Sequence, residues 1–296
     1  SDLSTMAKAM SSRELLASTV SVFDVFKIGI GPSSSHTLGP WRAAQSFVAR
    51  LRHEGRAADW GLGAVTGITV ELFGSLAKTG AGHGTDRACV LGLEDADPVT
   101  APLERIRERV SAVRSGEPLL LGGERPLRFD VQQDLQFHRN SALPRHPNGL
   151  RFTAWEDGRC LAGAVYYSTG GGFILEGDDD DEPVEHAEGG EPGSTATVPD
   201  EYGGPSAREL AELCGEEGIA LWQLSARREE AERSPDRIAE DLDLLSAVML
   251  HSAYRGATQS GELPGGLHVV RRAKRILAEV LPEAALRDEE SWQQAV

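Results

Sequence analysis

The stretch AVTGITVELFGSLA (residues 64–77) alternates apolar and polar side chains, the pattern of a β-strand with one buried face. Ile68, Val70 and Leu72 share one side of such a strand. KTGAGHGTDRACVLGLE (78–94) follows and predicts a glycine-rich turn and then a helix. The order strand, glycine-rich turn, helix places this part of the chain in a mixed α/β fold.

Further strands and one irregular corner are expected on both sides of this stretch. The chain is strand-like from Ser21 to the loop IGIGPSSSHTLGP (28–40). Downstream, strands are predicted in LRFDVQQDLQF (127–137), GLRFTAWED (149–157) and RCLAGAVYYS (159–168), with a turn at Asp157-Gly158 and a glycine corner at TGGGFI (169–174).

Helix signals occur in five stretches, two of which begin at Ser234 and Val269 and show helical spacing of apolar residues. Apolar residues recur at helical intervals over 41–51, and Gly55 suits the end of that helix. The helix after the glycine-rich turn would be capped by Thr85 or Asp86. SAREL, which begins at Ser206, has the serine-to-glutamate spacing of a capping box.

An acidic stretch rich in glycine and proline divides the chain. Its composition cannot bury enough apolar surface to order itself, which predicts a linker. The expected fold class is an α+β (mixed α/β) N-terminal domain, then this acidic linker, then an all-helical C-terminal segment. The predicted bounds are 1–20 for an N-terminal tail, 21–176 for the α+β domain, 177–205 for the linker and 206–296 for the helical segment.

Charge and cysteine usage narrow the function classes. The 296 residues carry 46 acidic and 30 basic side chains, so the net charge of −16 repels nucleic acid and anionic membrane surfaces. The sequence contains no run of eighteen apolar residues, so no membrane span is predicted. Residues 1–20 show no pattern of a secretory signal peptide. Cys89, Cys160 and Cys214 are far apart and lack zinc-site spacing, which favours a reducing cytoplasm.

The loop 28–40 could bind an anion. Its hydroxyls and one imidazole can point to one place, beside the start of the next helix, and a carboxylate or phosphate would fit there. The candidate residues are Ser33, Ser34, Ser35, His36 and Thr37. The alternative is a serine-rich turn that only caps a helix.

A second polar loop, FGSLAKTGAGHGTD (73–86), follows the opening strand. It carries Ser75, His83, Thr85 and Asp86, and an imidazole titrates near neutral pH, which suits proton transfer. The alternative is a surface hairpin with an ordinary histidine.

Two further loops carry weaker signals. FHRNSALPRHPNGLRF (137–152) contains Asn148, and YYSTGGGFI (166–174) contains Gly171, where backbone could approach a ligand. A polar surface turn and a structural glycine corner are the alternatives.

Four motifs together identify a family resemblance. SVFDVFKIGIGPSSSHTLGP, ELFGSLAKTGAGHGTD, LPRHPNGLRF and YYSTGGGFI occur in this order over residues 21–176. They resemble the beta domain of the bacterial iron–sulfur L-serine dehydratases, also called L-serine ammonia-lyases. ELPGGLHVVRRAKRIL, in the helical part, is similar to the family's passage into its catalytic alpha domain.

The resemblance implies deamination of L-serine to pyruvate and ammonia, a reaction of amino-acid catabolism. It implies a [4Fe–4S] cluster, held by three cysteines, whose open iron acts as a Lewis acid on the serine hydroxyl. It also implies roles for residues of this chain: His83 and His36 would be catalytic, and the substrate would be bound by Ser33, Ser34, Ser35, Thr37, Ser75, Thr85, Asp86, Asn148 and Gly171.

The cysteines depart from the family pattern. None of the three lies in a cluster-binding arrangement, so no metal ligand is assigned in this chain, and a cluster-bearing alpha domain or subunit is expected as partner. Residues 206–296 would be the start of that domain, with exposed apolar surface and a tendency to associate, for example as a homo-oligomer. Two alternatives remain open: a non-catalytic module that binds serine or another small acid, and a metal-assisted hydrolase.

Overall fold

A computed structural model describes residues 21–31, 33–58, 60–178, 181–185, 206–263, 269–282 and 288–295. The expected N-terminal tail (1–20) and most of the expected linker (186–205) lie outside the described residues. The chain divides into two compact units, one holding the described part of Ile28–Ala196 with Glu262–Val269, the other holding the described parts of Ser1–Lys27, Thr197–Gly261 and Val270–Val296.

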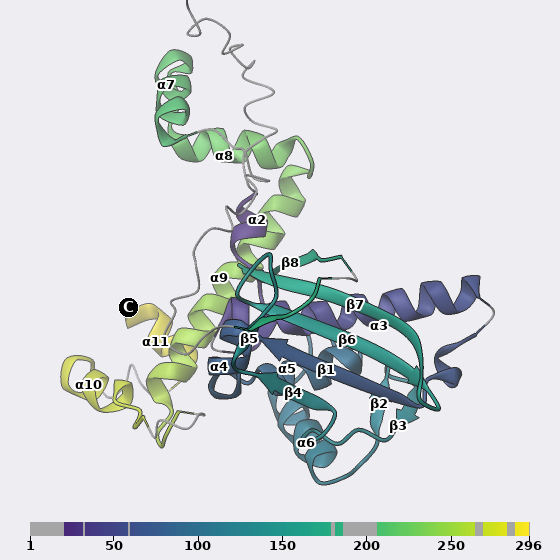
Figure 1. Cartoon of the computed structure of the whole chain (residues 1–296). Helices are drawn as coiled ribbons and strands as arrows, with labels where there is room; N and C mark the ends of the chain where they lie inside the picture. Colours follow the sequence, from purple (N-terminus) through teal and green to yellow (C-terminus); the bar gives the residue numbers. More distant parts are fainter. Residues whose placement is uncertain are drawn as a thin grey trace, which may run out of the picture. The chain divides into compact units, whose positions relative to one another are not determined.

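The first unit is a mixed α/β unit, and Figure 1 labels its helices α3–α6 and its strands β1–β8. Its elements are η1 (Ser34–Leu38, a π-helix), α3 (Gly39–Ala57), η2 (Leu62–Ala64), β1 (Gly67–Phe73), α4 (Gly74–His83), α5 (Thr85–Leu93), α6 (Leu103–Arg114), β2 (Leu119–Leu121), β3 (Arg125–Leu127), β4 (Leu135–His138), β5 (Ser141–Ala142), β6 (Gly149–Glu156), β7 (Arg159–Gly170), β8 (Phe173–Glu176) and β9 (Val184–Glu185).

A five-stranded sheet in the order β4-β1-β6-β7-β8 forms the frame of this unit. β1 pairs in parallel with β4, and the other neighbours pair antiparallel. Asp157 and Gly158 join β6 to β7 with positive φ angles of 49° and 88°, the backbone of a tight hairpin turn. β2 pairs with β3, and β5 with β9, in two small ribbons.

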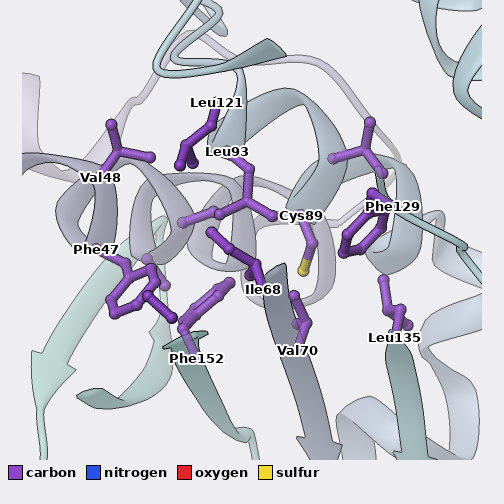
Figure 2. Packing of buried hydrophobic residues seen from close by; sticks show 14 of the residues in the cluster. Phe47, Val48, Ile68, Val70, Cys89, Leu93, Leu121, Phe129, Leu135 and Phe152 are labelled. Carbon is purple, nitrogen blue, oxygen red and sulfur yellow. The ribbon is translucent and has the colours of Figure 1, made fainter. Parts of the chain in front are cut away.

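One face of the sheet is covered by helices α3 and α5, as Figures 1 and 2 show. Figure 2 shows Phe47 of α3 beside Phe152 of β6, and their rings stack with centroids 5.3 Å apart. Ile68 and Val70 of β1 point into the same cluster, so the alternation seen in the sequence is the alternation between the two faces of the sheet.

The second unit is helical among its described residues. It contains α2 (Val22–Val25), α7 (Ala207–Glu217), α8 (Leu221–Glu230), α9 (Pro235–Thr258), α10 (Ala273–Val280) and α11 (Glu289–Ala295). The predicted capping box is present, since Ser206 and Glu209 exchange side chain-to-backbone hydrogen bonds at the start of α7. The buried Glu229 carboxylate accepts from the Ser21 hydroxyl at 2.9 Å and the Val22 N–H at 3.0 Å.

Exposed apolar side chains on this helical unit agree with the expectation from the sequence. Trp222, at the start of α8, is 71% exposed, and Leu221 and Met249 are also exposed. Across the described part of the chain, no helix combines the length and the apolar character needed to cross a membrane.

The mixed α/β fold class is confirmed, and four local predictions are wrong. Residues 22–25 are a short helix and not a strand. The expected strand 127–137 is two short strands, β3 and β4, separated by a turn at 131–134.

The expected glycine-rich turn after β1 is the helix α4. Leu76, Ala77 and Gly80 are buried at helical spacing, so packing outweighs the low helix propensity of its glycines. The cap of α5 is Gly84 in a left-handed conformation, and not Thr85 or Asp86.

The contact between α3 and α5 depends on Gly92. A Cβ at this position would lie 2.3 Å from the Trp41 carbonyl oxygen and 2.6 Å from Ala44 Cβ. We expect Gly92→Ala to lower the free energy of unfolding by about 1–3 kcal/mol, because overpacking forces the two helices apart.

The control is Gly82→Ala in α4, where an added Cβ would meet no atom within 4 Å. It should leave stability unchanged or raise it by up to about 1 kcal/mol. Urea unfolding followed by circular dichroism measures both, and equal stability of the two variants would contradict this account of the helix contact.

Candidate functional site

Helix α4 and the π-helix η1 meet next to the end of β1. Gly74, the first residue of α4, has a positive φ of 53°, and a Cβ there would lie 2.3 Å from the Pro147 carbonyl oxygen. The next residue, Ser75, donates its N–H to that same oxygen at 2.8 Å. A glycine is therefore required where the chain leaves β1, and it fixes Ser75 against the loop before β6.

The serine-rich stretch forms the π-helix η1, and Ser33 is its N-cap. The Ser33 hydroxyl accepts from the His36 N–H at 3.2 Å, and the Ser33 carbonyl accepts from the Thr37 N–H at 3.0 Å. Ser34 is exposed on this turn. Such π-turns are often found at functional sites.

His36 bridges two hydroxyl groups. Its Nδ1 lies 2.9 Å from the Ser35 hydroxyl, and its Nε2 lies 3.2 Å from the Ser75 hydroxyl. The Ser35 hydroxyl lies 3.5 Å from that of Ser33, which extends the row of polar groups. A neutral imidazole carries one N–H, so one of the two hydroxyls next to the ring donates to it and the other accepts from it.

His83, the last residue of α4, faces His36. The two ring centroids are 5.0 Å apart, and the rings are tilted by 47°. His83 Nδ1 lies 2.9 Å from the Thr79 carbonyl oxygen, which can only accept, so Nδ1 carries the proton. In the neutral ring, Nε2 of His83 is then the basic nitrogen.

Two threonines bind the carbonyl groups of these two histidines. The Thr37 hydroxyl donates to the His83 carbonyl at 2.9 Å, and the Thr85 hydroxyl donates to the His36 carbonyl. Both threonines are buried, with Thr85 fully so. The structure thus brings His36, His83, Thr37 and Thr85 together.

Asp86 lies in a different environment. Its carboxylate forms an ion pair with Arg114 at the end of α6, and it is 8% exposed. The described contacts tie Asp86 to α6 and not to the row of hydroxyls.

Asn148 and Gly171 lie on the loops that support η1. Asn148 is buried, and its side-chain amide donates to the Ser168 carbonyl at 3.0 Å. Gly171 lies in the turn between β7 and β8 with a φ of 59°. In the same turn, a Cβ on Gly172 would lie 2.7 Å from Leu38 of η1, so this turn packs directly against the π-helix.

Sequence reasoning missed the backbone acceptor at Thr79. The His83 side chain reaches the carbonyl of Thr79, four residues earlier, because this segment is a helix. The sequence did not show this contact, because the glycines of 74–83 predicted a turn. The apolar spacing of Leu76, Ala77 and Gly80 was the available signal for a helix.

Comparisons with known proteins place the chain in a family. Residues 21–179 match the family described as serine dehydratase beta chain. The chain belongs to this family. That assignment confirms the resemblance drawn from the four sequence motifs.

Several named relatives share most of this chain. It is 39% identical to an L-serine dehydratase of Streptomyces coelicolor over 274 residues, which cover 90% of this chain and 56% of the relative. It is 40% identical to L-serine dehydratase TdcG of Escherichia coli over 255 residues, 86% of this chain and 53% of the relative. An L-serine dehydratase of Mycobacterium tuberculosis is 40% identical over 257 residues, 86% of this chain and 52% of the relative. The chain thus spans about half the length of these curated relatives.

The surroundings of His36 favour its neutral form. Partial burial lowers the pKa of His36, and the neighbouring His83 lowers it further, whereas a hydrogen bond to the Ser75 backbone acts in the opposite direction. Burial also lowers the pKa of His146, whose Nδ1 accepts from the Asn148 N–H at 3.1 Å.

The cysteines of the described residues do not fit a [4Fe–4S] cluster. Cys89 is buried in the core, and burial, with Asp86 nearby, raises the pKa of its thiol. Cys160 is exposed on β7, and Cys214 lies on α7 of the other unit. Within the described ranges, no three histidine, cysteine, aspartate or glutamate side chains gather as a metal site. Cluster ligation needs several thiolates that converge.

The pKa of His36 tests this picture of the two rings. We expect it to lie below the ordinary imidazole value of about 6.5. In His83→Gln the pKa of His36 should rise, because the electrostatic effect of His83 on it is removed. It should stay below the ordinary value, because burial is the larger cause. NMR titration of ¹³C-labelled histidines measures both.

His53→Gln, at an exposed position on α3, is the matched control and should leave the pKa of His36 where it is in the wild type. An unchanged pKa of His36 in His83→Gln would show that the two rings do not interact.

Proposed function

We propose that this chain supplies the proton-transfer and substrate-binding residues of an L-serine dehydratase, which converts L-serine to pyruvate and ammonia. The observation that supports it most is the pair of facing imidazoles, His36 and His83, bordered by serine hydroxyls. The names of the relatives from Streptomyces coelicolor, Mycobacterium tuberculosis and Escherichia coli point to the same substrate.

His83 is the proposed base. Its Nδ1–H is held by the Thr79 carbonyl, so Nε2 offers its lone pair to the Cα proton of L-serine. As His83 takes that proton, the Cβ–O bond breaks, and the departing hydroxide takes the proton from the His83 imidazolium and leaves as water, which gives 2-aminoacrylate and restores the neutral imidazole. The enamine takes up a proton at carbon and becomes an imine, and water then replaces nitrogen to give pyruvate and ammonia.

The hydroxyl groups around η1 are the proposed contacts of the substrate carboxylate. Ser34 is exposed, and Ser33 and Ser35 flank it on the same short turn. Hydroxyls can donate to a carboxylate and also accept from an ammonium group, which suits a zwitterion.

His36 is proposed as a proton relay between its two hydroxyl partners. Because its pKa is lowered and a serine hydroxyl lies next to each ring nitrogen, it can take a proton at one nitrogen and release one at the other. Ser75 and Ser35 would thereby exchange a proton through the ring without building up charge.

The partner in this proposal is a cluster-bearing alpha domain or subunit, in the reducing cytoplasm. Because no group of metal ligands is found among the described residues, the proposal places the ligands of the iron–sulfur cluster that the family resemblance implies in the partner. The proposed roles of this chain are to bind the substrate and to transfer protons.

Anaerobic release of pyruvate from L-serine tests the proposal. The chain is combined with the part of the Streptomyces coelicolor relative that it does not match, after iron and sulfide have been supplied. We expect turnover by this combination, and a loss of at least about 100-fold in kcat for His83→Gln, since the general base is removed.

His53→Gln serves as the control and should turn over L-serine like the wild type. Equal kcat for His83→Gln and the wild type would exclude His83 as the base. Binding of L-serine without any turnover by the combination would favour a non-catalytic serine-binding module.

A further inference from the structure

The two histidine segments share a sequence pattern that the proposed reaction does not use. His36 is followed directly by Thr37, and His83 is followed after one glycine by Thr85. Each threonine hydroxyl donates to the backbone carbonyl of the other segment's histidine, so the two hydrogen bonds are reciprocal. They join parts of the chain that are 46 and 49 residues apart.

Neither threonine hydroxyl is free to donate a hydrogen bond to a substrate. Thr37 is 6% exposed and Thr85 is 0% exposed. A hydroxyl has a single proton to donate, and in both residues a carbonyl oxygen receives it. The two residues therefore act inside the protein, behind the imidazoles.

Both threonines are also held against a glycine. A Cβ on Gly31 would lie 2.3 Å from Thr37 Cγ2, and a Cβ on Gly80 would lie 2.7 Å from Thr85 Oγ1. The threonine side chains are therefore closely packed, and neither can rotate easily to bring its hydroxyl to a different acceptor.

We propose that Thr37 and Thr85 are positioning residues, a reciprocal clasp that holds the imidazoles of His36 and His83 in contact. Because each bond ends on the backbone of a histidine, loss of either hydroxyl releases one imidazole relative to the other. The role in turnover rests on the proposed function, whereas the contact between the rings can be measured without it.

The contact is tested by NMR on the whole chain with ¹³C-labelled histidines. At a centroid distance of 5.0 Å, the rings of His36 and His83 should give a nuclear Overhauser cross-peak, assigned with His36→Gln and His83→Gln. We expect the cross-peak to vanish in the isosteric double variant Thr37→Val/Thr85→Val and to persist in Thr37→Ser/Thr85→Ser, which keeps both hydroxyls.

Thr66→Val is the matched control. Thr66 also donates its hydroxyl to a backbone carbonyl, that of Trp155 at 3.2 Å, but it lies at the opposite end of β1. It should keep the cross-peak. A cross-peak that persists in the double valine variant overturns the clasp, and if that variant does not fold, the two single valine variants carry the same comparison.

Kinetics of the combined enzyme test the consequence for turnover. Each single valine variant should lower kcat for L-serine by about 10- to 100-fold, as expected when a reacting group is displaced by about an ångström, and change KM less than about two-fold. The serine variants should recover kcat, which a merely structural role of the methyl group would not predict.

The outcomes separate the two proposals. Loss of the cross-peak with an unchanged kcat overturns the role of the clasp in turnover. No turnover by the wild-type combination removes the proposed function, and the cross-peak then decides by itself whether Thr37 and Thr85 position the rings.

Discussion

Two hydrogen bonds, from the Thr37 hydroxyl to the His83 carbonyl and from the Thr85 hydroxyl to the His36 carbonyl, connect the segments on which the candidate site depends. Next to these two bonds, the rings of His36 and His83 pack with their centroids 5.0 Å apart. A hydrogen bond to a backbone carbonyl fixes the position of that residue's main chain. Each bond therefore fixes the main chain from which the imidazole of His36 or His83 extends. The site is thus built from backbone contacts that lie beneath the reactive side chains.

Close backbone approaches let the sheet present these two segments together. Gly74 turns the chain out of β1 against the Pro147 carbonyl, and a Cβ on Gly39, at the start of α3, would lie 1.9 Å from the Ser168 hydroxyl of β7. Ser168 is fully buried there, and its hydroxyl finds no partner among the described residues. An added methyl group at either glycine would move a histidine segment away from the sheet, so the two ends of the site depend on the same kind of contact.

The sequence predicted the regular parts of this arrangement and missed the contacts that join them. The strand within 64–77, the Asp157-Gly158 turn and the capping box at Ser206 rest on local patterns. The turn and the capping box are present, and the strand is present over Gly67–Phe73, whereas 74–77 already belong to α4. Helix α4 was missed because its three glycines, which have low helix propensity, predicted a turn despite the short apolar pattern.

The polar residues were chosen by type, and their partners depend on tertiary structure. His36 and His83 do lie together, but nothing local indicates that Thr37 and Thr85 face backbone carbonyls or that Asp86 faces Arg114, 28 residues away. A titration of the whole chain with L-serine tests most directly whether the two segments form one serine site. The NMR signals of ¹³C-labelled histidines are followed during the titration, and L-alanine, which lacks the hydroxyl, is the control. This account predicts that the signals of His36 and His83 shift together along one saturation curve with L-serine. Shifts of only one of the two, or of neither, at saturating L-serine would contradict it.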